Sequence, residues 1–134
     1  LQPLLMKSSL GWVSVAHNGN LVNAIELTKK LESEGSIFQS TSDTEVILHL
    51  VARSRKPQFL DRFIEALRSI EGAYSLVALT NKKLIGARDP LGIRPLVIGE
   101  LYGKFILAST VISFLTGSFS ALSVSERIFR FSCS

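Results

Sequence analysis

The sequence predicts an α+β fold, because three kinds of segment follow one another along its 134 residues. Residues 12–16 alternate apolar and polar side chains, as a half-buried strand does. Apolar residues then recur with a helical period over much of 21–70, and short β-rich segments separated by turn residues fill 74–108. A strand, helices and an antiparallel meander in this order place the helices on one face of a sheet.

The composition is that of a single globular domain, with 46% hydrophobic and 19% charged residues. The formal net charge is +4, but no aromatic residues interleave with the short basic clusters, so no nucleic-acid partner is expected. No apolar run approaches the roughly 20 residues that cross a bilayer, so no membrane contact is expected. The single cysteine, Cys133, excludes a disulfide framework and is compatible with the reducing cytoplasm.

The first strand leads into Asn18-Gly19, a pair typical of a tight turn. From Leu21 the apolar spacing predicts a helix, with Asn20 as its N-cap and Gly35 at its end. The sequence therefore predicts a strand, a tight turn and a helix, with Asn18-Gly19 at the corner.

A second helix is predicted through 46–51, because Ser42 and Glu45 have the spacing of a capping box. Asp43 lies in its first turn, where the helix dipole favours a carboxylate, but it could equally be presented to a ligand amine. Pro57 predicts the start of a third helix, which Gly72 would end.

The second half of the chain predicts four antiparallel strands joined by turns. The turns contain Asn81-Lys82, Pro90 with Gly92, and Tyr102-Gly103. The strands span 74–79, 84–87, 95–98 and 104–108. From Thr110 onward the pattern decays, because serines interrupt every candidate apolar face.

Asn18 and Gly19 also allow a chemical interpretation beside that of a plain turn. Asn18 offers a side-chain amide donor, and Gly19 allows the backbone to approach a substrate closely. Two such donors side by side could stabilise a developing oxyanion.

Three motifs occur in a specific order: AHNGNL at 16–21, SDTE at 42–45 and RDPLGIRPL at 88–96. With them, residues 1–109 resemble the class II glutamine amidotransferase domain of the amidophosphoribosyltransferase family. The first two motifs are shared more loosely by glucosamine-6-phosphate and glutamate synthases. Asn20 after the glycine and the long third motif favour the purine enzymes.

The resemblance implies an αββα sandwich of the N-terminal nucleophile hydrolase type. In that fold a cysteine at the mature N-terminus attacks the amide of glutamine, and its own α-amino group is the base. The resemblance further implies that the Asn18 side chain and the Gly19 N–H form the oxyanion hole. It implies that Asp43, with Gly19, binds the α-amino group of glutamine.

The family's wider properties are expectations of the same kind. It supplies ammonia for phosphoribosylamine formation, the first step of purine nucleotide biosynthesis, in cytoplasmic homo-oligomers. The parent enzyme uses magnesium and, in some members, an iron–sulfur cluster, whereas no cofactor or metal ligand is expected on this chain.

The chain also departs from the family pattern. The nucleophilic cysteine and first strands of the sandwich are expected upstream of Leu1, and Cys133 cannot replace that cysteine because the mechanism needs a thiol beside an α-amino group. The resemblance ends near Ser109, so 1–109 is expected to be a partial domain and 110–134 a divergent tail of the kind that a reading-frame shift produces. The phosphoribosyltransferase half of the family's enzymes is expected to be missing from this chain.

These departures predict an incomplete sandwich without glutaminase activity of its own and with weak or no glutamine binding. One alternative is a non-catalytic remnant of a broken gene, and another is a fragment of a related enzyme such as glucosamine-6-phosphate synthase.

Two arginines and the two histidines are interpreted mainly as structural residues. Arg88 and Arg94 are interpreted as fixing the turn between them and its packing on a neighbouring domain, with direct substrate contact as the alternative. His17 is interpreted as an orienting or satisfied residue rather than a general base, and His49 as structural within its helix.

Overall fold

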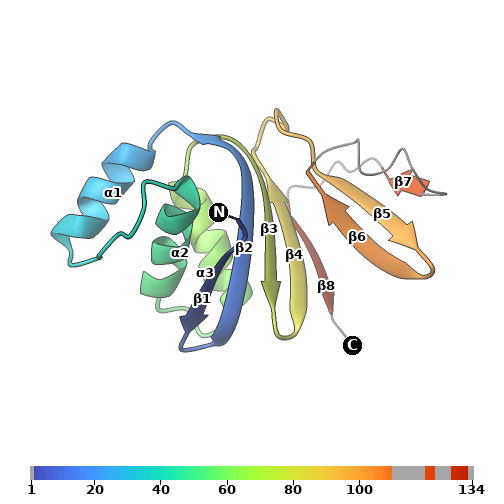
Figure 1. Ribbon diagram of the computed structural model, residues 1–134, viewed down its shortest axis with the longest axis horizontal. Coiled ribbons are helices and arrows are strands. Elements are labelled where there is room, and N and C mark those ends of the chain that lie inside the picture. Colours follow the sequence, from blue (N-terminus) through green and yellow to red (C-terminus); the bar gives the residue numbers. More distant parts are fainter. Residues whose placement is uncertain (1, 110–119, 123–127, 133–134) are drawn as a thin grey trace.

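The computed structural model describes residues 2–109, 120–122 and 128–132. It confirms the α+β class, with helices and antiparallel strands in the predicted order (Figure 1). The elements are β1 (Leu4–Ser8), β2 (Gly11–Leu21), α1 (Ala24–Ser33), α2 (Asp43–Arg53), α3 (Phe59–Ser69), β3 (Gly72–Thr80), β4 (Lys83–Arg88), β5 (Val97–Leu101), β6 (Lys104–Ala108), β7 (Ser120–Leu122) and β8 (Ile128–Ser132).

The strands form two sheets. One has the order β1-β2-β3-β4-β8, the other has the order β6-β5-β7, and every pair is antiparallel. The helices lie on one face of the five-stranded sheet (Figure 1). The core between these layers includes Val15, Ile47, Phe63 and Leu76, whose side chains are fully buried.

The second sheet packs against β4 at Gly86. A Cβ atom at this position would lie 2.9 Å from Leu107 and 3.2 Å from Leu96, so only a glycine allows this approach without a shift. The described chain therefore stacks a helical layer, a sheet and a second sheet, in agreement with part of the implied sandwich.

The predicted four-stranded meander is divided between the two sheets, which corrects the sequence-based prediction. β3 and β4 form the expected hairpin in the first sheet, whereas β5 and β6 pair in the second. The segment 89–96 carries the chain from one sheet to the other. Its proline at 95 has no N–H to donate to a continuing ladder.

The tight turn predicted at Asn18-Gly19 is wrong. β2 continues through both residues, and Asn18 pairs with Ser75 while Gly19 pairs with Tyr74. The following helix begins at Ala24 rather than directly after Asn20, and its N-cap is Asn23. A glycine at position 19 lets the backbone stay paired in a conformation that other residues resist.

The Asn23 side chain does not cap its own helix. Its Nδ2 donates to Ser69 O and its Oδ1 accepts from Glu71 N, each at 2.9 Å. One side chain thus connects the start of the helical segment to its end.

The other helix ends agree only partly with the sequence. α1 ends at Ser33, just before Gly35, as predicted. Ser42 is the N-cap of α2, and its hydroxyl accepts from Thr44 N at 3.3 Å. Gly72 does not end α3, because the helix stops at Ser69 and Gly72 is the first residue of β3.

The predicted boundary after Ser109 lies next to residues outside the described part of the chain. Of the predicted tail at 110–134, the structure describes only β7 and β8, and β8 pairs with β4. In the described residues, no helix is both long and apolar enough to cross a membrane.

Candidate functional site

Gly19 lies near the end of β2, where the backbones of β2 and β3 approach closely. Its φ is +139°, and a Cβ atom there would lie 2.1 Å from Ala73 O. A larger residue would have to push the two strands apart. The backbone at Gly19 is therefore fixed by a constraint that only glycine meets.

Asp43, the first residue of α2, contacts this strand end. Its Oδ2 accepts a hydrogen bond from the backbone N of Leu21 at 2.9 Å. The structure thus brings two of the candidate residues, Gly19 and Asp43, close together through Leu21. Aligned peptide dipoles at the start of α2 favour the negative charge of Asp43.

The side chain of Asn18 makes a different contact. Its Nδ2 donates to Ser109 Oγ, a long hydrogen bond of 3.4 Å, and Ser109 directly follows β6. Its cross-strand neighbour, Ser75, has a buried Oγ without a hydrogen-bond partner among the described residues. The Asn18 amide is therefore directed toward the end of the second sheet.

His17 is held between charges of opposite sign. Burial lowers its pKa, Arg94 lowers it further, and Asp43 opposes both by raising it. Because the net shift is downward, the imidazole is neutral at neutral pH. Its Nε2 is buried without a hydrogen-bond partner in the described part of the chain, so this nitrogen is not satisfied.

Asp89 organises the loop that follows β4, a role that the sequence analysis did not assign. Its carboxylate accepts hydrogen bonds from the backbone N of Tyr74 (3.2 Å), Ile93 (2.8 Å) and Arg94 (3.0 Å). Burial alone would raise the pKa of Asp89, but these hydrogen bonds outweigh it and the pKa is lowered. Tyr74, the residue of β3 that donates to Asp89, is the cross-strand partner of Gly19.

Arg88, interpreted from the sequence as a residue that fixes the turn, lies against the turn glycine. A Cβ atom at Gly92 would be 3.3 Å from its guanidinium. The carboxylate of Asp89 nevertheless makes the hydrogen bonds that hold the loop. An Asp before Pro is a recognisable sign of such a side-chain-to-backbone turn.

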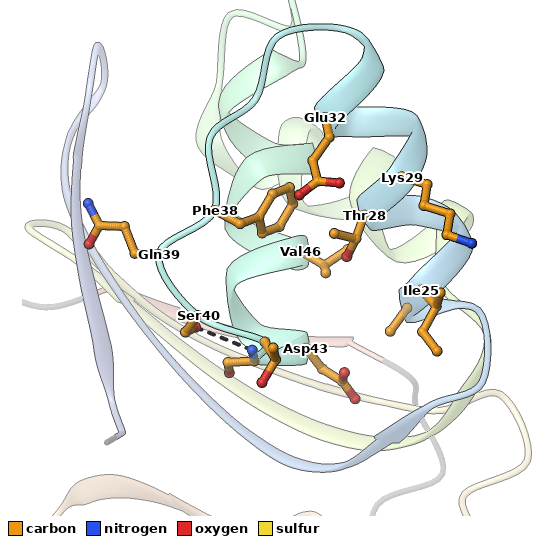
Figure 2. Close-up of a pocket in the computed structure, with 12 residues that line it drawn as sticks. Ile25, Thr28, Lys29, Glu32, Phe38, Gln39, Ser40, Asp43 and Val46 are labelled. Carbon is orange, nitrogen blue, oxygen red and sulfur yellow. Dashed lines mark hydrogen bonds between the residues drawn. The ribbon is translucent and has the colours of Figure 1, made fainter.

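A cavity of about 550 Å³ opens between α1, the segment 38–42 and the start of α2. Phe38, Thr28 and Val46 lie between the two helices, and Asp43 lies at the start of α2 (Figure 2). The lining combines apolar side chains with hydroxyl and carboxylate groups, which suits a small polar ligand with an aliphatic part.

His49, interpreted from the sequence as structural, lies in α2 with partners on both sides. Its Nε2 is 3.7 Å from Glu45 Oε1, and its ring centroid is 4.4 Å from that of Phe38.

The described residues do not fit a metal centre. No group of three or more His, Cys, Asp or Glu side chains gathers anywhere in the described ranges.

Residues 1–116 match the family model described as a glutamine amidotransferase domain. An amidophosphoribosyltransferase of Rhizobium etli is 55% identical over 109 residues, which are 81% of this chain and 22% of the relative. Chloroplastic amidophosphoribosyltransferase 3 of Arabidopsis thaliana is 52% identical over 100 residues, which are 75% of this chain and 19% of the relative. The chain thus spans about a fifth of the length of these relatives.

Two solved structures resemble the whole arrangement. The allosteric regulatory enzyme of purine biosynthesis superposes with a TM-score of 0.92 at 39% identity, covering 98% of this chain and 29% of that one. Glutamine phosphoribosylpyrophosphate amidotransferase from B. subtilis gives a TM-score of 0.88 at 37% identity, covering 98% of this chain and 31% of the other.

Proposed function

The chain belongs to the family of glutamine amidotransferase domains, in the form that amidophosphoribosyltransferases carry, and on this basis we propose that it binds glutamine for a glutaminase reaction. The reaction hydrolyses the side-chain amide and supplies ammonia for phosphoribosylamine formation in purine nucleotide biosynthesis. The names of the relatives favour this parent over glucosamine-6-phosphate synthase. A cytoplasmic location and a homo-oligomeric parent belong to the same proposal.

The contact between Leu21 N and Asp43 Oδ2 is the observation that supports the proposal most directly. It holds a carboxylate at the end of the strand that carries Asn18 and Gly19. A carboxylate beside an ammonium group makes a charge-assisted contact, which distinguishes free glutamine from glutamine within a peptide. Asp43 is therefore the proposed partner of the substrate α-amino group.

Asn18 and Gly19 are the proposed donors to the oxyanion. A thiolate attacks the amide carbon of glutamine, and negative charge develops on the amide oxygen, where these donors act. The C–N bond then breaks with release of ammonia, and water hydrolyses the thioester to glutamate. Each donor of this kind contributes about 2.7–4 kcal/mol to transition-state stabilisation.

The family resemblance implies that the thiol in this scheme belongs to a cysteine with a free α-amino group. Cys133 is the single cysteine of the sequence and lies outside the described residues. The role proposed for residues 1–109 is therefore recognition of glutamine and stabilisation of the oxyanion, rather than nucleophilic attack.

Titration of the 134-residue protein with glutamine tests this proposal, with backbone amide chemical shifts as the readout. We expect weak binding of L-glutamine that shifts the Leu21 amide, and no binding of Nα-acetyl-glutamine, which lacks the ammonium group. Asp43→Asn should weaken binding roughly 10- to 100-fold, because it removes a hydrogen bond to a charged group.

Asp61→Asn is the matched control, since Asp61 lies in the first turn of another helix, α3, and is exposed. Equal binding of the acetylated compound would contradict the role of Asp43. Absence of any glutamine binding would instead favour the non-catalytic remnant.

A further inference from the structure

The segment 37–42 enters α2 without regular secondary structure, yet its backbone is firmly held by one side chain. Glu45, only 8% exposed, accepts hydrogen bonds from Gln39 N to Oε1 at 2.7 Å and from Ser40 N to Oε2 at 2.8 Å. The Ser40 hydroxyl also donates to Oε2 at 2.6 Å. Both carboxylate oxygens of Glu45 are therefore engaged by this segment.

The hydrogen bonds continue from Ser40 to the start of the helix. Ser42 N donates to Ser40 Oγ at 3.2 Å, the interaction drawn as a dashed line in Figure 2. The Ser42 hydroxyl in turn accepts from Thr44 N at 3.3 Å. The residues on both sides of Asp43 thus belong to one network that begins at Glu45.

This arrangement differs from the capping box that the sequence predicts. In a capping box the Glu side chain returns to the backbone N–H of the N-cap residue, here Ser42. Glu45 instead reaches two residues further back, to Gln39 and Ser40, and Ser40 receives the Ser42 N–H. The carboxylate therefore holds the wall of the cavity rather than only the end of the helix.

Glu45 is also charged where it is buried. Burial would raise its pKa, but the hydrogen bonds from Ser40 and Gln39, together with His49, outweigh burial and lower it. A carboxylate in this state accepts hydrogen bonds that are stronger than those to a neutral amide.

We infer that Glu45 is a positioning residue for Asp43. By clamping Gln39 and Ser40, it fixes the entry into α2 and holds the Asp43 carboxylate where Oδ2 meets Leu21 N at the end of β2. The effect of this positioning on glutamine binding rests on the proposed function. If Asp43 binds glutamine, Glu45 acts on the affinity for glutamine only through Asp43.

Glu45→Gln tests the inference, because it keeps the shape of the side chain and replaces one acceptor oxygen with a donor. The first readout is amide hydrogen exchange in the 134-residue protein without ligand. We expect exchange at Gln39 and Ser40 to accelerate roughly tenfold or more, because both amides lose their charged acceptor. Exchange at Leu21 should accelerate with them, because Asp43 is then no longer held against the Leu21 amide. Glu26→Gln, at an exposed position of α1, is the matched control and should leave all three amides unchanged.

Faster exchange at Gln39 and Ser40 with an unchanged Leu21 would overturn the inference, because the clamp would then act on its own segment alone. If Glu45→Gln does not fold, Ser40→Ala removes the central hydroxyl of the network. Amide exchange at Leu21 is then compared with exchange at Gln39 in the same way.

Glutamine titration of the same proteins separates this inference from the proposed function. We expect Glu45→Gln to weaken glutamine binding roughly tenfold, as the loss of one charged contact would. If the unaltered protein binds glutamine and Glu45→Gln binds it equally well, the inference fails while the proposed function stands. If the unaltered protein binds no glutamine, the proposed function fails, and exchange at Leu21 still decides whether Glu45 positions Asp43.

Discussion

Gly19 combines two constraints, a positive φ and the lack of space for a Cβ atom beside Ala73 O. Gly35 has a positive φ of +95° but nothing within 4 Å of its Cβ position. Comparing alanine substitutions at these two positions therefore separates backbone strain from a steric clash.

We expect Gly19→Ala to lower the free energy of unfolding by more than about 3 kcal/mol, because strain and clash act together. Gly35→Ala should lower it by only about 1–2 kcal/mol, the strain of a left-handed backbone. Urea denaturation measures both values. Similar losses at the two positions would show that β3 moves away from Gly19 easily.

At the scale of single residues, the roles of Asn18, Gly19 and Asp43 stay predictions, and they came from the family resemblance. The residue types alone did not single them out, because Asn-Gly is typical of a turn and the first turn of a helix favours a carboxylate. The hydrogen bonds of Glu45 and Asp89 could not be predicted, because both carboxylates bind backbone N–H groups, which every sequence position except proline offers.

The loop after β4 depends on the charge of Asp89, and this gives its stability a pH dependence. The pKa of Asp89 in the folded protein is lowered from 3.8. Its stabilisation is thus fully present above the unfolded value and is lost as the pH falls through the folded pKa.

Asp89→Asn should therefore destabilise the protein near pH 7 and weaken the decline of its stability in acid. We expect a loss of about 1–3 kcal/mol at pH 7, because backbone N–H groups of the loop lose a charged acceptor. Thermal unfolding between about pH 2 and pH 7, with the exposed Asp61→Asn as control, measures the effect. Parallel pH profiles of Asp89→Asn and the unaltered protein would contradict this account.

The helices could be predicted as elements because their apolar residues recur with a constant period. Their ends depended on tertiary contacts, and so Asn23 rather than Asn20 precedes α1 while Gly72 belongs to a strand. The division of the predicted meander had no local signal. The turn between β4 and β5 has the same Pro and Gly residues whether the next strand joins one sheet or another.

The two sheets of the molecule meet where β4 has no side chain. Gly86→Val should force Leu107 and Leu96 away and lower the free energy of unfolding by about 1–3 kcal/mol, as overpacking does. Leu107→Ala should recover part of this loss when the two changes are combined, because it vacates the space that the larger side chain at position 86 needs. A double-mutant cycle from urea denaturation measures the coupling, and strictly additive losses would rule out contact between the sheets at this point.

The architecture as a whole was implied by the resemblance rather than by periodicity. Alternation identifies a strand and its buried face, but it does not say which sheet a strand joins. The stacking of the second sheet on β4 depends on a glycine at 86 and leucines at 96 and 107, three positions that no local pattern connects.

The link made by Asn23 has a consequence for the order of folding. Its hydrogen bonds to Ser69 and Glu71 join residues 46 and 48 positions apart. They lie beside the pairing of β2 with β3, two strands that are neighbours in the sheet but distant along the chain. Bringing such distant segments together from an unfolded chain has an entropic cost, because the loop between them must be closed. Helices that form first shorten this loop, so we expect the pairing of Gly19 with Tyr74 to be a late event, reached after the helices in refolding.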